Sequence, residues 1–300
     1  MTSKTCIIIA GPTAVGKTSV SIALAQHFKT DIISADSRQC YKELNIGVAK
    51  PADGQLQLVK HYFINSHSVT EDVNAGMFEQ YALNAVNEIF TEHDVAIMVG
   101  GTGLYIKAFC EGMDAIPAID AVVRTEIIQK YNAGGLLWLQ EEIKEKDPAW
   151  YASGEIQNPH RIMRALEVIS TTGKSLLAFQ KSQKIKRDFD ILEIGLALPR
   201  EQLYQQIDTR TDDMIAQGLE QEVRSLLQYR GLNALQTVGY KELFEYIDGD
   251  INIEQAINNI KRNTRHYAKR QLTWFKKDQK IKWFSPLDYS QLIKSFHNLV

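Results

Sequence analysis

A glycine-rich segment near the N-terminus constrains the fold more than any other feature of this sequence. Residues 11–18 read Gly-Pro-Thr-Ala-Val-Gly-Lys-Thr and match the pattern G-x-x-x-x-G-K-[ST] in full. The apolar run Thr5–Ala10 precedes this segment, and residues 18–28 follow it with apolar side chains at helical spacing. A strand, a loop and a helix in this order predict a P-loop, whose backbone N–H groups and helix N-terminus hold a phosphate group.

Every residue of this loop is a candidate for binding a diphosphate or triphosphate: Gly11, Pro12, Thr13, Ala14, Val15, Gly16, Lys17 and Thr18. Lys17 adds a positive charge, and the hydroxyl of Thr18 can ligate Mg²⁺. P-loop proteins that hydrolyse a nucleotide usually end a neighbouring strand in an acidic residue. Here the apolar run 95–99 ends in Gly-Gly-Thr-Gly instead, which favours a transferase that holds a leaving phosphate group over a motor or a switch.

The rest of the pattern predicts an α/β fold with a P-loop NTPase-like parallel sheet. Further strands are expected at 31–35, 95–99 and 191–198, with a helix over 78–90. Between about 114 and 190 the periodicity is helical. We therefore expect a core domain of residues 1–114 and 190–300, with basic C-terminal helices, and a helical insertion domain of residues 115–189.

Composition and charge narrow the class of protein. With 300 residues and 44% hydrophobic content, the chain can form one large α/β domain and a smaller insert. It has no apolar run of about 18 residues, and its three cysteines lack the spacing of a zinc site. We expect a cytoplasmic protein that does not enter a membrane.

The net charge of −2 conceals two basic stretches. Residues 261–282 contain nine Lys or Arg against the single acid Asp278, and a weaker run covers residues 174–187. In the last long helix, Ile253, Ile257, Ile260, Tyr267 and Leu272 are expected to pack, whereas Arg262, Arg265 and Lys269 share another face. Either stretch can be a solvated face or a surface for a polyanion.

Two polar clusters are expected beside the P-loop, because the carboxyl ends of parallel strands meet at one edge of the sheet. Asp36 follows the second strand and is the best-placed carboxylate, either as a general base or as a magnesium ligand through water; it could also simply cap a helix. Ser37, Arg38 and Gln39 offer hydrogen bonds to a base or phosphate, and Gln39 could pair with an adenine edge. Thr102, in the glycine loop 100–103, should converge on Asp36 and Thr18.

With these residues in view, the chain resembles the bacterial-type tRNA dimethylallyltransferases, the IPP transferase family. The matching segments run in order through almost the whole sequence: 11–18, Asp36-Ser-Arg-Gln-Cys-Tyr41, Gly47-Val-Ala-Lys-Pro51, Gly100-Gly-Thr-Gly-Leu-Tyr105, Arg161-Ile-Met-Arg-Ala-Leu-Glu167, Val238-Gly-Tyr240 and residues 264–275. Together these motifs are far more specific than a P-loop alone.

The resemblance implies transfer of a dimethylallyl group from dimethylallyl diphosphate to N6 of the adenosine 3′ of the anticodon, position 37, in tRNAs that read codons beginning with U, with release of diphosphate. It implies that Asp36 is the general base and that Thr102 touches the reacting adenosine. Lys17, and Mg²⁺ as cofactor on Thr18, complete the expected catalytic set, because they can stabilise the leaving diphosphate. For tRNA binding it implies Arg124 and the segment 160–164. With the residues singled out above, the candidates for tRNA binding are Asp36, Ser37, Arg38, Gln39, Thr102, Arg124, His160, Arg161, Ile162, Met163, Arg164, Gly239, Tyr240, Arg265, Lys269 and Arg270. His160 departs from the family, which more often has Gln there. We expect a monomer that binds the anticodon stem-loop.

Three other hypotheses about the function stay open at this point. A nucleotide or small-molecule kinase also uses a P-loop and an inserted lid, although it would need a clamp for a γ-phosphate. A prenyl transferase acting on free AMP or ATP would share the P-loop and Asp36, with less need for a basic helix. An ATP-dependent binding module would show nucleotide-dependent affinity for a partner and form no product.

Overall fold

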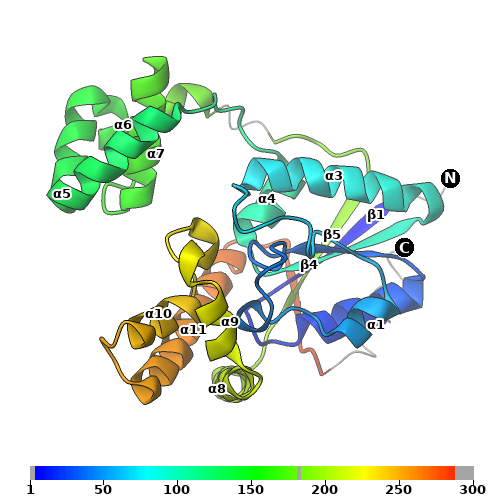
Figure 1. Cartoon of the computed structure of the whole chain (residues 1–300). Helices are drawn as coiled ribbons and strands as arrows, with labels where there is room; N and C mark the ends of the chain where they lie inside the picture. The colour runs from blue at the N-terminus through cyan, green and yellow to red at the C-terminus, as the bar shows by residue number, and fades with distance from the viewer. Residues whose placement is uncertain (1–3, 181–183, 288–300) are drawn as a thin grey trace. The chain divides into compact units, whose positions relative to one another are not determined.

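The computed structural model describes residues 4–180 and 184–287, and the chain divides into two compact units (Figure 1). One unit contains residues 1–112 and 185–300, and the other contains residues 113–184. The insertion therefore begins two residues earlier and ends five residues earlier than the sequence pattern suggested. Each unit has its own apolar core.

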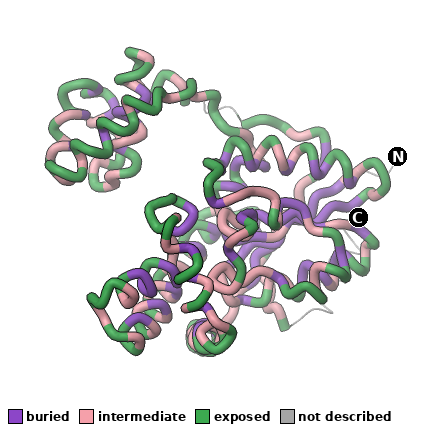
Figure 2. The backbone as a smooth tube through the Cα atoms, in the orientation of Figure 1, coloured by how far each residue is buried: buried purple, intermediate pink, exposed green. Residues whose placement is uncertain are grey.

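The first unit is built on a six-stranded parallel sheet with the order β3-β2-β4-β1-β5-β6. Its strands are β1 (Thr5–Ala10), β2 (Ile32–Ala35), β3 (His61–Tyr62), β4 (Val95–Gly100), β5 (Asp190–Leu196) and β6 (Lys282–Phe284). The central strands are apolar on both faces because helices cover both sides of the sheet, as Figure 2 shows by their burial. The predicted α/β class and parallel core are confirmed.

Alternate residues of β1 point into two different cores. Cys6 and Ile8 join the cluster formed with α3 (Ala75–Glu92) and α4 (Gly103–Glu111). Ile7 and Ile9 join the cluster formed with α1 (Lys17–Phe28) and α8 (Arg200–Ala216). The remaining helical elements of this unit are α2 (Asp53–Leu58), α9 (Leu219–Ser225), α10 (Tyr240–Ile247), α11 (Ile253–Phe275) and the short 3₁₀ turns η1 (Ile46–Val48), η3 (Leu227–Tyr229) and η4 (Asn233–Leu235).

The second unit is wholly helical, as predicted from its periodicity. It consists of α5 (Ala121–Lys146), α6 (Pro148–Ser153), α7 (Pro159–Thr172) and η2 (Leu176–Phe179). Gly135 interrupts α5 with a φ of 66°, so the helix is kinked at this residue. Leu139, Ile143, Trp150 and Ile162 form the centre of its core.

Two details differ from the sequence-based expectations. The short strands β3 and β6 at the two edges of the sheet were missed, because two or three residues are too few to show a period. In α11 the buried stripe is Ala256, Ile260, Thr264, Ala268, Gln271 and Phe275, and of the five residues expected to pack only Ile260 is fully buried. The stripe uses small and polar residues because α11 lies close to the glycine loop at the sheet edge, where a hydropathy pattern gives no signal.

Within the basic run 174–187, Lys174, Lys184 and Lys186 are exposed, as a charged face requires, whereas Arg187 is not. The Arg187 side chain is only 9% exposed and belongs to the core unit, where its guanidinium donates to the carbonyls of Ala108 and Phe109 and pairs with Glu79. It thus closes the C-terminal end of α4. Lys181, in the same run, lies outside the described residues. Within the described ranges, no helix combines the length and apolar character needed to cross a bilayer.

The tight packing around Gly100, the last residue of β4, predicts that a substitution there lowers stability. A Cβ atom there would overlap the carbonyl group of Ala35 on the neighbouring strand. We expect Gly100→Ala to lower the free energy of unfolding by about 1–3 kcal/mol, measured by urea denaturation. Gly54→Ala is the matched control: it sits in α2 with open space around its Cβ position, so it should change stability by less than about 1 kcal/mol. Equal effects of the two substitutions would contradict this packing argument.

Candidate functional site

The P-loop folds around three residues with positive φ. Gly11 has a φ of 153°, Ala14 of 64° and Gly16 of 94°. A side chain at Gly11 would meet the carbonyl oxygen of Leu196 on β5 at 2.8 Å, so only glycine fits between the two strands. Gly16 is the N-cap of α1. The loop therefore directs successive backbone N–H groups and the N-terminus of α1 toward one cleft, an arrangement that favours an anion.

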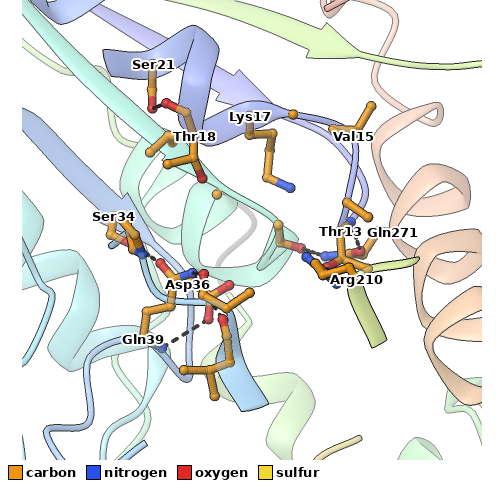
Figure 3. Close-up of a pocket in the computed structure, with 18 of the residues that line it drawn as sticks. Thr13, Val15, Lys17, Thr18, Ser21, Ser34, Asp36, Gln39, Arg210 and Gln271 are labelled. Atoms are coloured by element: carbon orange, nitrogen blue, oxygen red, sulfur yellow. Dashed lines mark hydrogen bonds between the residues drawn. The ribbon is translucent and has the colours of Figure 1, made fainter. Parts of the chain in front are cut away.

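Lys17 occupies the centre of this loop (Figure 3). Its Nζ donates to the carbonyl oxygens of Gly11 at 3.0 Å and Pro12 at 2.7 Å. Burial lowers the pKa of Lys17 to about 8; the negative charge of Asp36 opposes this shift and the positive charge of Arg210 adds to it. The ammonium is thus held in place by the loop and only weakly solvated, which strengthens its interaction with an anion.

Two side chains that the sequence did not single out complete the P-loop. Gln271 of α11 accepts a hydrogen bond from the backbone N–H of Thr13 at 2.8 Å, and its Nε2 donates to the carbonyl of Gly101 at 2.9 Å. Arg210 of α8 donates to the hydroxyl of Thr13 at 2.6 Å. Burial lowers the pKa of Arg210 and Asp36 raises it. Gln271 lay inside a motif of the family, whereas nothing near Arg210 in the sequence marked it.

Asp36 lies across the cleft from Lys17 (Figure 3). Its Oδ1 accepts hydrogen bonds from the backbone N–H groups of Arg38 at 2.8 Å and Gln39 at 3.2 Å. The carboxylate therefore caps its own turn, which fixes its orientation. No described residue donates a hydrogen bond to Oδ2, so one oxygen is left for a ligand.

Thr102 joins the glycine loop to the Asp36 turn, as predicted. Its hydroxyl accepts a hydrogen bond from Ser37 N at 3.1 Å, and its N–H donates to the carbonyl of Ala35 at 3.2 Å. Thr18 lines the same cleft as Asp36. The three loops that follow β1, β2 and β4 therefore converge at one edge of the sheet.

Two clefts meet at Asp36. The first, about 320 Å³ in volume, contains the P-loop, and the second, about 460 Å³, lies against α10 and α11. Arg38, Val238 and Arg270 line the second cleft. The residues common to both are Thr13, Asp36, Val48, Ala49, Arg210 and Tyr267. A group bound in one cleft can thus face a group bound in the other across Asp36.

The residues of the core unit that were expected to contact tRNA lie in different environments. The Gln39 amide donates to the carbonyls of Val48 and Ala49 and accepts from Ser34, so it is not free to pair with adenine. Gly239 is buried and the Tyr240 side chain is fully enclosed. Arg265 pairs through two nitrogens with Asp208 and lies over the Tyr204 ring. Lys269 and Arg270 are exposed.

The insertion brings part of the predicted set together on its own surface. Arg124 of α5 and Arg164 of α7 both pair with Glu167, at 3.6 and 3.2 Å, and Arg161 pairs with Glu155 at 2.8 Å. His160 is exposed and Met163 is partly buried. Ile162 is fully buried in the helical core, so its side chain is a packing residue and not a tRNA contact.

The residues present suit magnesium that is shared with a phosphate ligand. No cluster of three His, Cys, Asp or Glu side chains that could hold a metal occurs among the described residues. The Thr18 hydroxyl and the Asp36 carboxylate nevertheless line one cleft with the P-loop. Mg²⁺ commonly uses one or two protein oxygens together with phosphate oxygens and water, so this donor set fits.

Comparison with known proteins gives a consistent result. The profile of a family described as IPP transferase matches residues 39–278. A tRNA dimethylallyltransferase of Cytophaga hutchinsonii is 48% identical over 290 residues, which is 97% of this chain and 95% of that protein.

Two solved structures are also similar. The tRNA isopentenylpyrophosphate transferase of Bacillus halodurans has a TM-score of 0.71 and 34% identity, covering 99% of this chain and 95% of that one. A eukaryotic dimethylallyltransferase acting on tRNA has a TM-score of 0.76 and 29% identity, covering 91% and 70%.

The lowered pKa of Lys17 predicts a pH dependence of anion binding. Since the ammonium loses its proton above about pH 8, affinity for inorganic diphosphate should fall as the pH rises through that value, as measured by titration calorimetry. Lys17→Met should bind more weakly and lack this fall, and parallel pH profiles would contradict the assignment.

The lowered pKa of Lys17 also predicts how the stability of the fold depends on pH. Between about pH 8 and 10.5 the unfolded chain binds more protons at Lys17 than the folded chain does, so the contribution of Lys17 to the free energy of unfolding should increase over that interval.

Proposed function

Because the chain belongs to the IPP transferase family, we infer that it is a tRNA dimethylallyltransferase. It transfers a dimethylallyl group to an adenosine of tRNA. The observation that most supports this activity is the pair of clefts that meet at Asp36. One cleft suits a diphosphate donor, and the other, lined by arginines, suits a nucleotide acceptor.

We propose that the acceptor atom is N6 of adenosine 37, next to the anticodon, in tRNAs that read codons beginning with U. Dimethylallyl diphosphate is the donor. The new bond joins N6 to the allylic carbon, while the carbon–oxygen bond to diphosphate breaks and the diphosphate leaves with the electron pair. The proton of N6 goes to a base, so diphosphate and the modified tRNA are the products.

The P-loop is the leaving-group site in this proposal. Charge develops on the diphosphate oxygens as the bond breaks, and fixed donors aimed at these oxygens lower the barrier. Lys17 and Arg210 supply two partly desolvated cations, and the loop amides supply dipoles. Gln271 holds the loop backbone through Thr13, so the donors need no rearrangement during the reaction.

Asp36 is the general base in this proposal. The exocyclic amine of adenine is a poor nucleophile because its lone pair is delocalised into the ring, so removal of a proton during attack assists the reaction. A positioned base typically contributes on the order of 10²–10⁴-fold. The hydrogen bonds to Oδ1 orient the carboxylate, and Oδ2 is directed to the substrate. Thr102 fixes the neighbouring turn through Ser37.

Magnesium would be held by the Thr18 hydroxyl and, through water, by Asp36, so that one carboxylate oxygen stays available as the base. When bound, it would neutralise charge on the diphosphate.

The target adenosine must leave its base stack to reach Asp36. The exposed cations Lys269 and Arg270 of α11 suit the phosphates beside it, and Arg124, Arg161 and Arg164 of the insertion suit other parts of the anticodon stem-loop. The catalytic groups come from a single chain, so we propose a monomer, acting in the cytoplasm.

Transfer of labelled dimethylallyl groups from the diphosphate donor to unmodified bulk tRNA tests this function. We expect label in tRNA only, with parallel reactions containing free AMP or ATP. Label in AMP would instead indicate a free-nucleotide prenyl transferase. Release of phosphate from ATP without a prenylated product would indicate a kinase or a nucleotide-dependent switch.

Asp36→Asn tests the base separately from binding. The amide keeps the size of the side chain and an oxygen that can accept from Arg38 and Gln39, but it cannot take up a proton at neutral pH. We expect the single-turnover rate to fall at least about 10²-fold, with tRNA affinity in filter binding changed by less than about threefold. A near-normal rate would exclude Asp36 as the base.

A further inference from the structure

Two segments that match motifs of the family, residues 47–51 and 238–240, meet at the carboxylate of Glu222, which belongs to neither segment. Glu222 of α9 accepts hydrogen bonds from the backbone N–H of Ile46 at 2.7 Å and of Gly47 at 3.1 Å. Its Oε1 also accepts from the hydroxyl of Tyr240 at 2.5 Å. A single side chain therefore ties η1 to the start of α10.

Tyr240 packs against η1 and so supports this contact. Its side chain is fully buried, and a Cβ atom added to Gly47 would lie 2.5 Å from its ring. Glycine at 47 is thus needed for η1 to pack this closely against the ring. Burial and the adjacent Glu222 carboxylate raise the pKa of Tyr240, so the phenol keeps its proton and acts as a donor.

The same turn continues to Asp36 through Gln39. The carbonyl oxygens of Val48 and Ala49 accept from Gln39 Nε2 at 3.2 and 3.0 Å. The backbone N–H of Gln39 in turn donates to Asp36 Oδ1 at 3.2 Å. Val48 and Ala49 line both clefts. Each link from Glu222 to Asp36 is therefore a hydrogen bond or a short stretch of backbone.

We propose that Glu222 is a positioning residue for the transfer reaction: by holding η1 on Tyr240 it sets Gln39, and through Gln39 the orientation of Asp36 between the two clefts. This inference rests on the proposed function. It also gives Gln39, Gly47 and Tyr240 a role that does not require contact with tRNA.

The first test is Glu222→Gln, which keeps the size of the side chain but directs an NH₂ group at one of the three donors. Since a misplacement of about 1 Å can cost about 10²-fold in rate, we expect the single-turnover transfer rate at saturating donor to fall about 10- to 100-fold. The donor concentration for half-maximal rate should change by less than about threefold, because the P-loop is held by other residues. Tyr240→Phe should show the same pattern with a smaller loss.

A matched control lies on the same helix. Glu220 is partly exposed and bonds to Arg224 in α9, away from η1, so Glu220→Gln should leave the rate unchanged. A purely structural role of Glu222 would lower the melting temperature and leave the rate per folded molecule unaltered. That result would overturn the proposal.

A double-mutant cycle that combines Glu222→Gln with Gln39→Leu tests whether the two side chains affect Asp36 through the same contacts or independently. Neither side chain contacts the other, yet both act on η1. We expect the double variant to lose no more rate than the worse single variant, whereas losses that multiply would overturn the connection. A wild-type protein with no transfer activity would count against the proposed function itself; an active wild type with an unaffected Glu222→Gln would count against this inference alone.

Discussion

The site depends on the close approach of three parallel strands whose central member ends in glycine. β4 lies between β1 and β2, so the P-loop and the Asp36 turn can face each other only across the end of β4. Gly100 and Gly101 leave room there: a side chain at Gly100 would overlap Ala35, and one at Gly101 would displace the Gln271 amide. The absence of side chains at this point allows both the convergence of the loops and the contact with α11.

The charged side chains of the first cleft are unfavourable in the free protein but favour the binding of an anion. Desolvation lowers the pKa values of Lys17 and Arg210, and the carboxylate of Asp36 offsets part of this shift for both. Two cations that line the same partly buried cleft repel each other, and an arriving diphosphate would relieve that repulsion. The unfavourable electrostatics of the free protein thus favour binding of the leaving group, a common property of functional sites.

The parts of the structure that the sequence could predict are those with a local signal. The P-loop, the core strands and the helical insertion each have a motif or a period, and the position of Asp36 and Thr102 follows from the rule that parallel strands end together. Gln271, Arg210 and Glu222 could not be found in this way, because each binds a residue far away in the sequence. Tyr240 and Ile162 show the opposite error: a residue within a functional motif can serve packing, which only burial reveals.

The strand order also has a consequence for how the protein is made. β1 is paired on one side with β4 and on the other with β5, which is about 185 residues later in the chain, so the emerging polypeptide cannot close its central sheet until the insertion has left the ribosome. The insertion's core lies within residues 113–184 and can form first. Arg210 and Gln271 follow later still. A prematurely terminated chain can therefore contain the complete G-x-x-x-x-G-K-T motif and Asp36 and yet lack the side chains that hold the loop, so truncated products should be inert and not partly active.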